Sequence, residues 1–318
     1  MLWAAIGSAC GAVDSTSHGR IILAMESGEV SAFQHLWVVD GDGRLESLIQ
    51  ITEGAVVDEA PRWSPDQRFV AFDRSAPRTR GLDLRVRVRE LSTGSEQEVP
   101  AGAWPEGLRS DGRPFWSRDG GLLGFERTLP GVVSGARLGS ARLWLVPIVR
   151  GPREWVLGGP FQTSPQEGLS RSNADWGRPG EIVFQQELTV SGPVRWGVGV
   201  QTFPGGRETT VLAGGCCERH VPRVAPDEER LAYLESESPA RTRVMVSRVN
   251  GADATQVVCD GEWLPTSWSP DGRQLLLVPR DRPPSLWIVD VPVLGGPCAP
   301  PRQLIRLPHQ VSSADWVG

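Results

Sequence analysis

One pattern recurs along most of this chain: an apolar or tryptophan anchor, a polar turn rich in Pro, Asp and Gly, and a short apolar run. The segments "WSPDQRFVAF", "WSRDGGLLGF" and "WSPDGRQLLLV" are three of its copies. A chain built from such copies folds as a repeat protein, because one unit alone cannot bury its apolar faces. The anchors recur about every 50 residues, and they are Trp63, Trp116, Trp176, Val224, Trp268 and Trp316.

A second apolar slot follows the first in each copy, as in "HLWVVD", "ARLWLVP" and "SLWIVD", and a glycine-containing turn comes after it. Short runs of Val, Ile, Leu, Phe and Trp between turn residues are typical of β-strands. Each copy therefore predicts four strands joined by hairpins. We expect an all-β fold in residues 18–318, a single six-bladed β-propeller of four-stranded blades.

The two chain ends complement each other. Residues 312–318, "SSADWVG", form an inner strand and its anchor without the apolar run, and residues 19–25, "GRIILAM", form that run without an anchor. Joined together, they reproduce the internal copy "NADWGRPGEIVF". We expect the strand near Trp316 to pair with the strand that begins near Ile21 and to close the ring. The alternative, an open array, would leave an unpaired strand edge.

The phrase "PRWSPD" at residues 61–66 and "WSPDG" at residues 268–272, each followed by an apolar run, resembles the repeat of TolB-like propellers, relatives of WD repeats. The resemblance covers residues 18–318. It implies a propeller fold. Within the family, TolB is a periplasmic protein that binds a lipoprotein partner, and related propellers occur as non-catalytic domains of peptidases. Gln67 and Glu228 replace the turn glycine in two copies, which predicts strain or another turn type there.

Charge and hydropathy limit the kinds of partner and the cellular locations that the sequence allows. The net charge is −5 and every basic residue is arginine, which argues against general nucleic-acid binding. No stretch approaches the roughly 20 apolar residues of a membrane-spanning helix. Residues 1–17 are interpreted as a disordered arm or the remnant of a secretion or lipoprotein leader, with Cys10 of "GSAC" as the lipidation candidate. We expect a monomer located outside the cytoplasm, in the periplasm or attached to the envelope, with a cytoplasmic location as the alternative.

Local catalytic motifs are missing from the sequence: it contains no nucleophile elbow, phosphate loop, dinucleotide fingerprint or metalloprotease helix. The adjacent Cys216 and Cys217 could form a disulfide with Cys259 or a thiolate metal site, or remain thiols, and Cys298 has no obvious partner. We expect no cofactor and no metal. The alternating Arg85, Arg87 and Arg89 form either a basic contact patch or ion pairs with acidic residues of an adjacent blade or loop.

Function in repeat folds resides in loops on a rigid scaffold. The longest loops are expected at residues 99–114, 127–141 and 158–173. Trp104 and Trp263 lie in loops that enter inner strands, where they either anchor a ligand or cap the core. His220 and His309 lie in similar loops, as ligand contacts, a general base or solvated side chains. The predicted ligand site is the channel mouth, with Asp58, Glu59, Trp104, Glu106, Arg109, Arg171, His220, Glu262, Trp263 and His309.

The sequence favours a non-catalytic binding or scaffold propeller that recognises a protein, peptide or glycan ligand at the channel mouth. The alternative is a small hydrolase or lyase whose catalytic residues converge on the central channel from different blades, because such a site leaves no local motif. A third reading is a sensor or scaffold domain. Carboxylates and histidines within hydrogen-bond reach across the channel would favour the enzyme.

Overall fold

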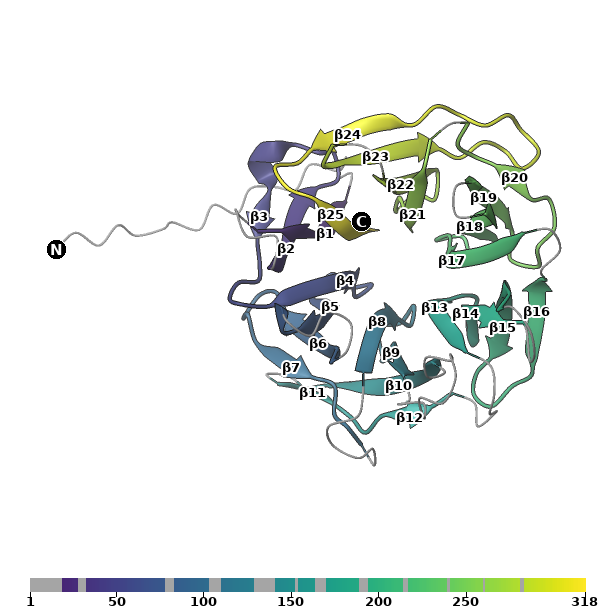
Figure 1. The fold of residues 1–318 in the computed structure, drawn as a ribbon. Coiled ribbons are helices and arrows are strands. Elements are labelled where there is room, and N and C mark those ends of the chain that lie inside the picture. Colours follow the sequence, from purple (N-terminus) through teal and green to yellow (C-terminus); the bar gives the residue numbers. More distant parts are fainter. Residues whose placement is uncertain are drawn as a thin grey trace.

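The computed structural model describes residues 19–27, 33–77, 83–102, 110–128, 141–151, 154–163, 170–188, 194–213, 217–238, 241–259, 261–280 and 283–318. Small antiparallel sheets are arranged in a ring (Figure 1). The short 3₁₀ turn η1 (Leu45–Ser47) is the named helical element of the described residues. The prediction of an all-β ring of antiparallel sheets is confirmed.

Strands from successive sequence repeats occupy equivalent places in the ring (Figure 1). The inner strands are β4 (Val57–Trp63), β8 (Ser110–Trp116), β13 (Arg171–Trp176), β17 (Glu218–Val224), β21 (Trp263–Trp268) and β25 (Val311–Val317). The second strands are β1 (Arg20–Glu26), β5 (Phe69–Ser75), β9 (Leu122–Thr128), β14 (Glu181–Glu187), β18 (Arg230–Ser238) and β22 (Gln274–Pro279).

The third and outer strands complete the sheets toward the rim. The third strands are β2 (Gln34–Asp40), β6 (Arg85–Glu90), β10 (Ala141–Arg150), β15 (Trp196–Thr202), β19 (Arg241–Arg248) and β23 (Ser285–Asp290). The outer strands are β3 (Ile49–Gln50), β7 (Glu96–Glu98), β11 (Trp155–Leu157), β12 (Phe161–Gln162), β16 (Glu208–Leu212), β20 (Thr255–Gln256) and β24 (Arg302–Arg306).

Hydrogen bonding groups these strands differently from the six separate four-stranded sheets that the sequence predicts. Three sheets have four strands, one has five, because β10 pairs with both β11 and β12, and one has eight. The eight-stranded sheet arises because a single parallel pair, Gln34 with Val57, joins β2 to β4. The difference therefore lies at a few pairings near the sheet borders.

The chain ends pair as the sequence predicts. Strand β25 runs antiparallel to β1, with Trp316 opposite Ile21 and Ala314 opposite Leu23. These four residues are buried in one apolar cluster together with Leu276 of β22. The predicted closure of the ring across the chain ends is confirmed, and backbone hydrogen bonds hold both ends in one sheet.

The anchor tryptophans fill the seams between neighbouring sheets. Trp116 packs in one buried cluster with Phe69 and Val86 of the preceding sheet, and with Leu123 and Phe125 of its own. The ring centroids of Phe69 and Trp116 lie 6.3 Å apart. Burial of such large side chains between sheets is the main apolar contribution that holds adjacent repeat units together.

The turns after the anchors share one backbone conformation, whether or not they contain glycine. Gln67 and Glu228 have φ of 58° and 60°, close to the 66° of Gly120 and the 68° of Gly272. The alternative of a different turn type is therefore wrong, and strain is the outcome, since side chains disfavour positive φ.

The disulfide corrects the predicted cysteine pairing. Cys259 bonds to Cys298, with a Cα–Cα distance of 5.1 Å, and not to Cys216 or Cys217. Cys217 is buried outside this bond, and Cys216 and Cys10 lie outside the described residues. A parallel bridge between Val258 and Ala299 places the two half-cystines side by side. Sequence spacing could not reveal this contact, because it joins irregular segments of two repeats.

The three arginines of β6 form ion pairs on their own sheet. Arg87 contacts Glu96 at 3.0 Å and Glu98 at 2.9 Å, and Arg89 contacts Glu96 at 3.6 Å. Arg85 binds Asp83 at 2.6 Å. Ion pairing is confirmed, although the β7 carboxylates, rather than those of an adjacent blade, supply most of it.

No helix among the described residues combines the length and the apolar character that crossing a membrane requires.

Candidate functional site

Two cavities lie along the channel. The wide cavity, of about 590 Å³, lies where the inner strands begin and is lined by residues such as Glu59, Ser110 and Ser312. The narrow cavity, of about 270 Å³, lies where they end, among the anchor tryptophans and beside Gly318. Arg62 and Arg223 line both cavities, so they mark the boundary between them.

The residue directly before each anchor lines the narrow cavity. Successive side chains of a strand point to opposite faces, so the anchor enters the seam while its predecessor faces the channel. We call these residues the channel ring: Arg62, Phe115, Asp175, Arg223, Ser267 and Asp315.

Inner strands bulge on the side of the wide cavity. Ala60, Arg113, Asn173 and Val221 have positive φ, and the strand register shifts at these points. Such bulges leave a backbone N–H outside the strand ladder. A side chain accepts it each time, from β25 of the same sheet for Ala60 and from the preceding sheet for the other three. The acceptors are Ser313 Oγ for Ala60, Asp73 for Arg113, Glu126 for Asn173 and Gln185 for Val221.

Two of these acceptors are buried carboxyl groups that line the wide cavity. Burial raises the pKa of Asp73 well above its usual value, although the Arg113 N–H and charge oppose the shift. Burial likewise raises the pKa of Glu126, against the opposing charge of Arg113, which lies 3.2 Å away. Raised carboxyl pKa values are typical of catalytic acids, but here the hydrogen bonds to Arg113 and Asn173 N–H give both groups a structural task.

Three channel-ring side chains join adjacent inner strands. Asp315 Oδ2 accepts the Trp63 N–H at 2.9 Å, and Asp175 Oδ2 accepts the Val224 N–H at 2.9 Å. Ser267 Oγ accepts the Trp316 N–H at 3.1 Å and donates to Asp315 at 2.9 Å. We call these contacts side-chain seams.

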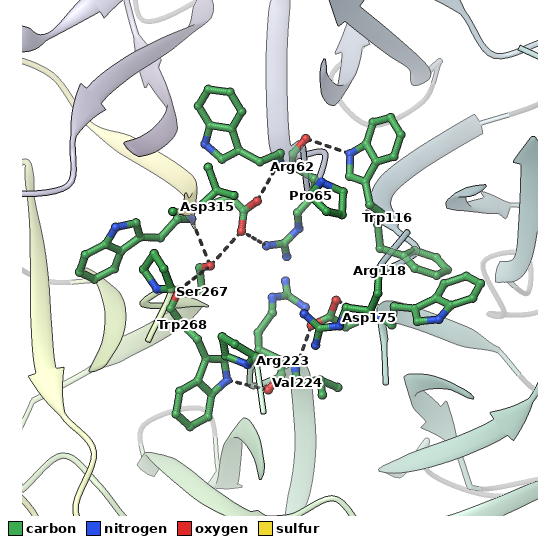
Figure 2. A pocket seen from close by; sticks show the side chains of 18 residues that line it. Arg62, Pro65, Trp116, Arg118, Asp175, Arg223, Val224, Ser267, Trp268 and Asp315 are labelled. Carbon is green, nitrogen blue, oxygen red and sulfur yellow. Dashed lines mark hydrogen bonds and ion pairs between the residues drawn. The ribbon is translucent and has the colours of Figure 1, made fainter. Parts of the chain in front are cut away.

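Two other seams use an indole. Trp116 Nε1 donates to the Arg62 carbonyl at 3.1 Å, and Trp268 Nε1 donates to the Arg223 carbonyl at 2.9 Å (Figure 2). In these indole seams the backbone of the arginine makes the contact. The arginine side chain is therefore left to extend into the channel.

The guanidinium groups of Arg62 and Arg223 point toward one another across the channel (Figure 2). Arg62 forms an ion pair of 3.1 Å with Asp315. Arg223 donates to two carbonyls, of Thr266 at 3.0 Å and Pro222 at 2.8 Å, and forms no ion pair in the part of the chain that the structure describes. Burial, and then the charge of Arg62, lower the pKa of Arg223 to about 9, while Asp175 and Asp315 oppose the shift.

The predicted site residues are dispersed. Glu59 lines the wide cavity, and none of the other predicted residues that the structure describes lines either cavity. Asp58 is buried against Arg74, with oxygen–nitrogen distances of 2.6 and 2.9 Å. Arg171 is buried in an ion pair of 2.7 Å with Glu208.

The predicted aromatic and histidine contacts are also structural or peripheral. Trp263 is 1% exposed, and its ring centroid lies 5.3 Å from that of Trp287, so it packs in the core and does not anchor a ligand at the surface. His220 lies 3.4 Å from Glu218, and burial lowers its pKa against the effect of that carboxylate. Glu262 and His309 are half-buried. Trp104, Glu106 and Arg109 lie outside the described residues.

The channel ring escaped the sequence prediction, although the repeat contains a signal for it. Aligning the copies on their anchors puts Arg62, Asp175, Arg223 and Asp315 in one column. A charged residue beside a buried anchor in strand after strand indicates a polar interior face. The sequence prediction placed the site in the loops instead, because loops carry function in most scaffolds.

Metal-ligating side chains do not gather within the described ranges: no group of three or more His, Cys, Asp or Glu residues there could hold an ion.

Comparison with solved structures supports the fold. TolB from Acinetobacter baumannii is 17% identical, with a TM-score of 0.62 over 94% of this chain and 66% of TolB. An oligogalacturonate lyase in complex with manganese is 15% identical, with a TM-score of 0.51 over 85% of this chain and 71% of the lyase. A chain of a nidogen/laminin complex is 8% identical, with a TM-score of 0.57 over 93% and 98%.

This chain thus spans just under two thirds of the length of that TolB. No protein-family model matches the chain, and no curated protein matches its sequence. The fold is that of a TolB-like β-propeller, as the sequence repeats predict.

Proposed function

We propose that this TolB-like β-propeller is a non-catalytic binding protein that takes up its ligand through the wide cavity. The observation that carries the proposal is a cavity of about 590 Å³ with a charged lining on a rigid ring of sheets. Pockets for small ligands or for one part of a larger ligand have volumes of roughly 300–1,000 Å³. The ligand we favour is a protein, peptide or glycan that inserts one group into the channel.

An enzymatic role is the second candidate. In its favour are Asp73 and Glu126, with their raised pKa values, and the similarity of fold to an oligogalacturonate lyase. Against it, both carboxyl groups accept backbone N–H groups of the next sheet, which explains their burial without catalysis. A fold alone does not transfer an activity.

The blade count of six is part of this proposal. Within the eight-stranded sheet, β25-β1-β2-β3 and β4-β5-β6-β7 are antiparallel units that one residue pair joins. We count these units as two blades, and the other sheets as one blade each. Each blade then contributes one channel-ring residue.

We propose an extracytoplasmic location, because the Cys259–Cys298 disulfide fits an oxidising compartment. The arm at residues 1–17, the lipidation of Cys10 and the contribution of Trp104, Glu106 and Arg109 to the mouth stay predictions. A monomer remains our expectation.

The experiment is capture of partners from an envelope extract of the source cells on immobilised protein. The Ser110→Arg variant places a long cation in the wide cavity, since Ser110 lines it, and we expect it to lose at least about tenfold in bound partner. The control, Thr209→Arg, places the same side chain on the exposed outer strand β16 and should bind as the wild type does. Equal capture by Ser110→Arg, or no capture by the wild type, would refute binding through this cavity.

Glu126→Gln addresses the enzymatic alternative directly. Its amide oxygen can still accept the Asn173 N–H, but it cannot transfer a proton. We expect no difference in hydrolase or lyase activity between this variant and the wild type. Loss of a measurable hydrolase or lyase activity in this variant, with the fold intact, would favour the enzyme.

A further inference from the structure

The two arginines of the indole seams place two like charges face to face in the channel. Arg62 and Arg223 come from β4 and β17, distant in sequence, and their guanidinium groups converge at the centre of the channel (Figure 2). Like charges that face each other away from bulk water repel strongly. Such an arrangement needs negative charge nearby.

The protein supplies only part of that charge. Asp315 pairs with Arg62 at 3.1 Å, but its other oxygen accepts the Trp63 N–H. Asp175 attracts Arg223 from a longer distance, while its oxygens accept the N–H groups of Trp176 and Val224. Both carboxylates are therefore held in the seams.

Arg113 and Arg118, which also lie near the channel, are better compensated than Arg223. Arg113 pairs with Glu126 at 3.2 Å, and Arg118 reaches the Ala225 carbonyl at 3.0 Å and Glu228 at 3.8 Å. Arg223 uses Nε and Nη1 for carbonyls, and its Nη2 forms no hydrogen bond with the residues that the structure describes. The Nη2 group of Arg223 thus stays available in the channel.

The lowered pKa of Arg223, about 9, agrees with incomplete compensation. This value still lies above neutral pH, so the guanidinium carries its charge under ordinary conditions. An anion beside it would raise the pKa again, because an opposite charge favours the protonated form.

We infer that the Arg62–Arg223 pair binds an oxyanion group, a carboxylate or a phosphate, carried by the ligand that enters through the wide cavity. The inference rests on the proposed function and names the chemistry that the channel selects. Guanidinium groups bind oxyanions through parallel N–H···O contacts. Because the pair lies between the cavities, the anion binds at mid-channel, while the rest of the ligand occupies the wide cavity.

The narrow cavity limits what can lie beyond the pair. Its volume is about 270 Å³, and Pro65, Pro226, Pro270 and the C-terminal Gly318 line it. This space accommodates an anionic group with its water molecules, and the wide cavity has about twice that volume for the rest of the ligand.

Arg223 could instead serve only to hold the Thr266 and Pro222 carbonyls. The two roles differ in what a substitution changes. A purely structural arginine affects the Tm of the protein without any anion, whereas a binding arginine affects the response to an added oxyanion.

The experiment measures the Tm and the calorimetric affinity of the full chain with inorganic phosphate or acetate, at matched ionic strength in chloride. We expect at least one oxyanion to raise the Tm of the wild type, and Arg223→Gln to bind it at least about tenfold more weakly. The control is Arg302→Gln, on the exposed face of β24, which should respond as the wild type does. A response to acetate alone indicates a carboxylate ligand, and a response to phosphate alone indicates a phosphate ligand.

Arg223→Lys keeps a positive charge but lacks the planar guanidinium group. If Arg223→Gln does not fold, this variant tests whether Arg223 binds the oxyanion. A weakened response supports the inference, and an unchanged response overturns it. No response of the wild type to either anion, or a response that Arg223→Gln retains, also overturns it as an adventitious ion only.

Failure of the inference is separable from failure of the proposed function. Suppose that Ser110→Arg abolishes partner capture while Arg223→Gln captures partners normally. The wide cavity then binds a ligand, but the arginine pair does not contribute to binding it. If the oxyanion response depends on Arg223 while the wild type captures no partner, the anion site stands and the proposed macromolecular ligand is wrong.

Discussion

The seams around the channel are of two kinds. At the side-chain seams, Asp315, Asp175 and Ser267 accept a backbone N–H of the next inner strand. At the indole seams, the carbonyls of Arg62 and Arg223 accept the Nε1–H of the next anchor. Both kinds connect neighbouring inner strands. At a side-chain seam the channel-ring side chain itself makes the contact. At an indole seam its backbone carbonyl makes the contact, so the side chain can make other contacts.

This difference shows why charge alone does not identify a functional residue. The aspartates and arginines of the channel ring occupy equivalent positions and line the same cavity. The aspartates accept hydrogen bonds from backbone N–H groups that would otherwise be buried without a partner. Burying an unpaired N–H lowers the stability of the fold. The arginines do not, so they are the better candidates for a role in binding.

The largest effect is expected from Asp315→Ala. It removes the acceptor of the Trp63 N–H and the ion-pair partner of Arg62, which faces Arg223. We expect a loss of about 2–4 kcal/mol in the free energy of unfolding, since breaking a mostly buried pair by removing one partner is costly. Urea denaturation measures it. Asp315→Asn, which keeps an acceptor, should lose less, and a loss below about 0.5 kcal/mol for the alanine variant would contradict a structural role.

Asp73 provides a test of the bulge contacts, with an effect of about 1–3 kcal/mol. Asp73→Leu leaves the Arg113 N–H without its acceptor and should destabilise by that amount, whereas Asp73→Asn keeps an acceptor. Because the folded protein holds the Asp73 proton more tightly than the unfolded chain, stability falls as pH rises from about 4 through the raised pKa.

Denaturation curves across this pH range should show a smaller decline in Asp73→Asn than in the wild type, and Glu126 accounts for part of what remains. An identical decline in both proteins would mean that Asp73 does not titrate in this range.

Exchanging an anchor tryptophan for phenylalanine isolates the indole hydrogen bond. Trp268→Phe loses the bond to the Arg223 carbonyl as well as some packing. Trp63→Phe is a matched control, because Trp63 is also buried while its Nε1 has no hydrogen-bond partner among the described residues. We expect Trp268→Phe to cost about 1 kcal/mol more than Trp63→Phe. Equal losses in thermal denaturation would show that the indole bond contributes nothing net.

The smallest effect is expected at the strained turns. Glu228→Gly should raise the free energy of unfolding by about 0.5–1 kcal/mol, since φ of 60° disfavours a side chain. Gln67→Gly should gain less, because Gln67 also accepts a hydrogen bond from Arg20. The change in Tm measures both, and a decrease in Glu228→Gly would mean that the Arg118 contact outweighs the strain.

The sequence sufficed for the fold because its signals are local and repeated. Anchors, turns and apolar runs predicted the antiparallel sheets, and the unmatched ends predicted the pairing of Trp316 with Ile21. The sheet borders were not predictable from the sequence. A single parallel pair, Gln34 with Val57, joins β2 to β4, and no sequence pattern indicates this pair.

The site was predicted less well, because the important contacts join different repeats. Loop position suggested Trp263 as a binding anchor, but its ring is buried against Trp287. Nothing local in the sequence shows that the Arg223 guanidinium faces that of Arg62, since closing the ring creates this proximity. The Cys259–Cys298 bond is a similar case.

The most direct measurement is an X-ray structure of crystals grown with selenate, an oxyanion that anomalous scattering locates. We predict selenate between the guanidinium groups of Arg62 and Arg223, with Asp175 and Asp315 still bound to the N–H groups of Val224 and Trp63. Selenate found only at surface arginines, in a protein whose Tm also fails to respond to acetate, would contradict the assignment of these arginines to binding.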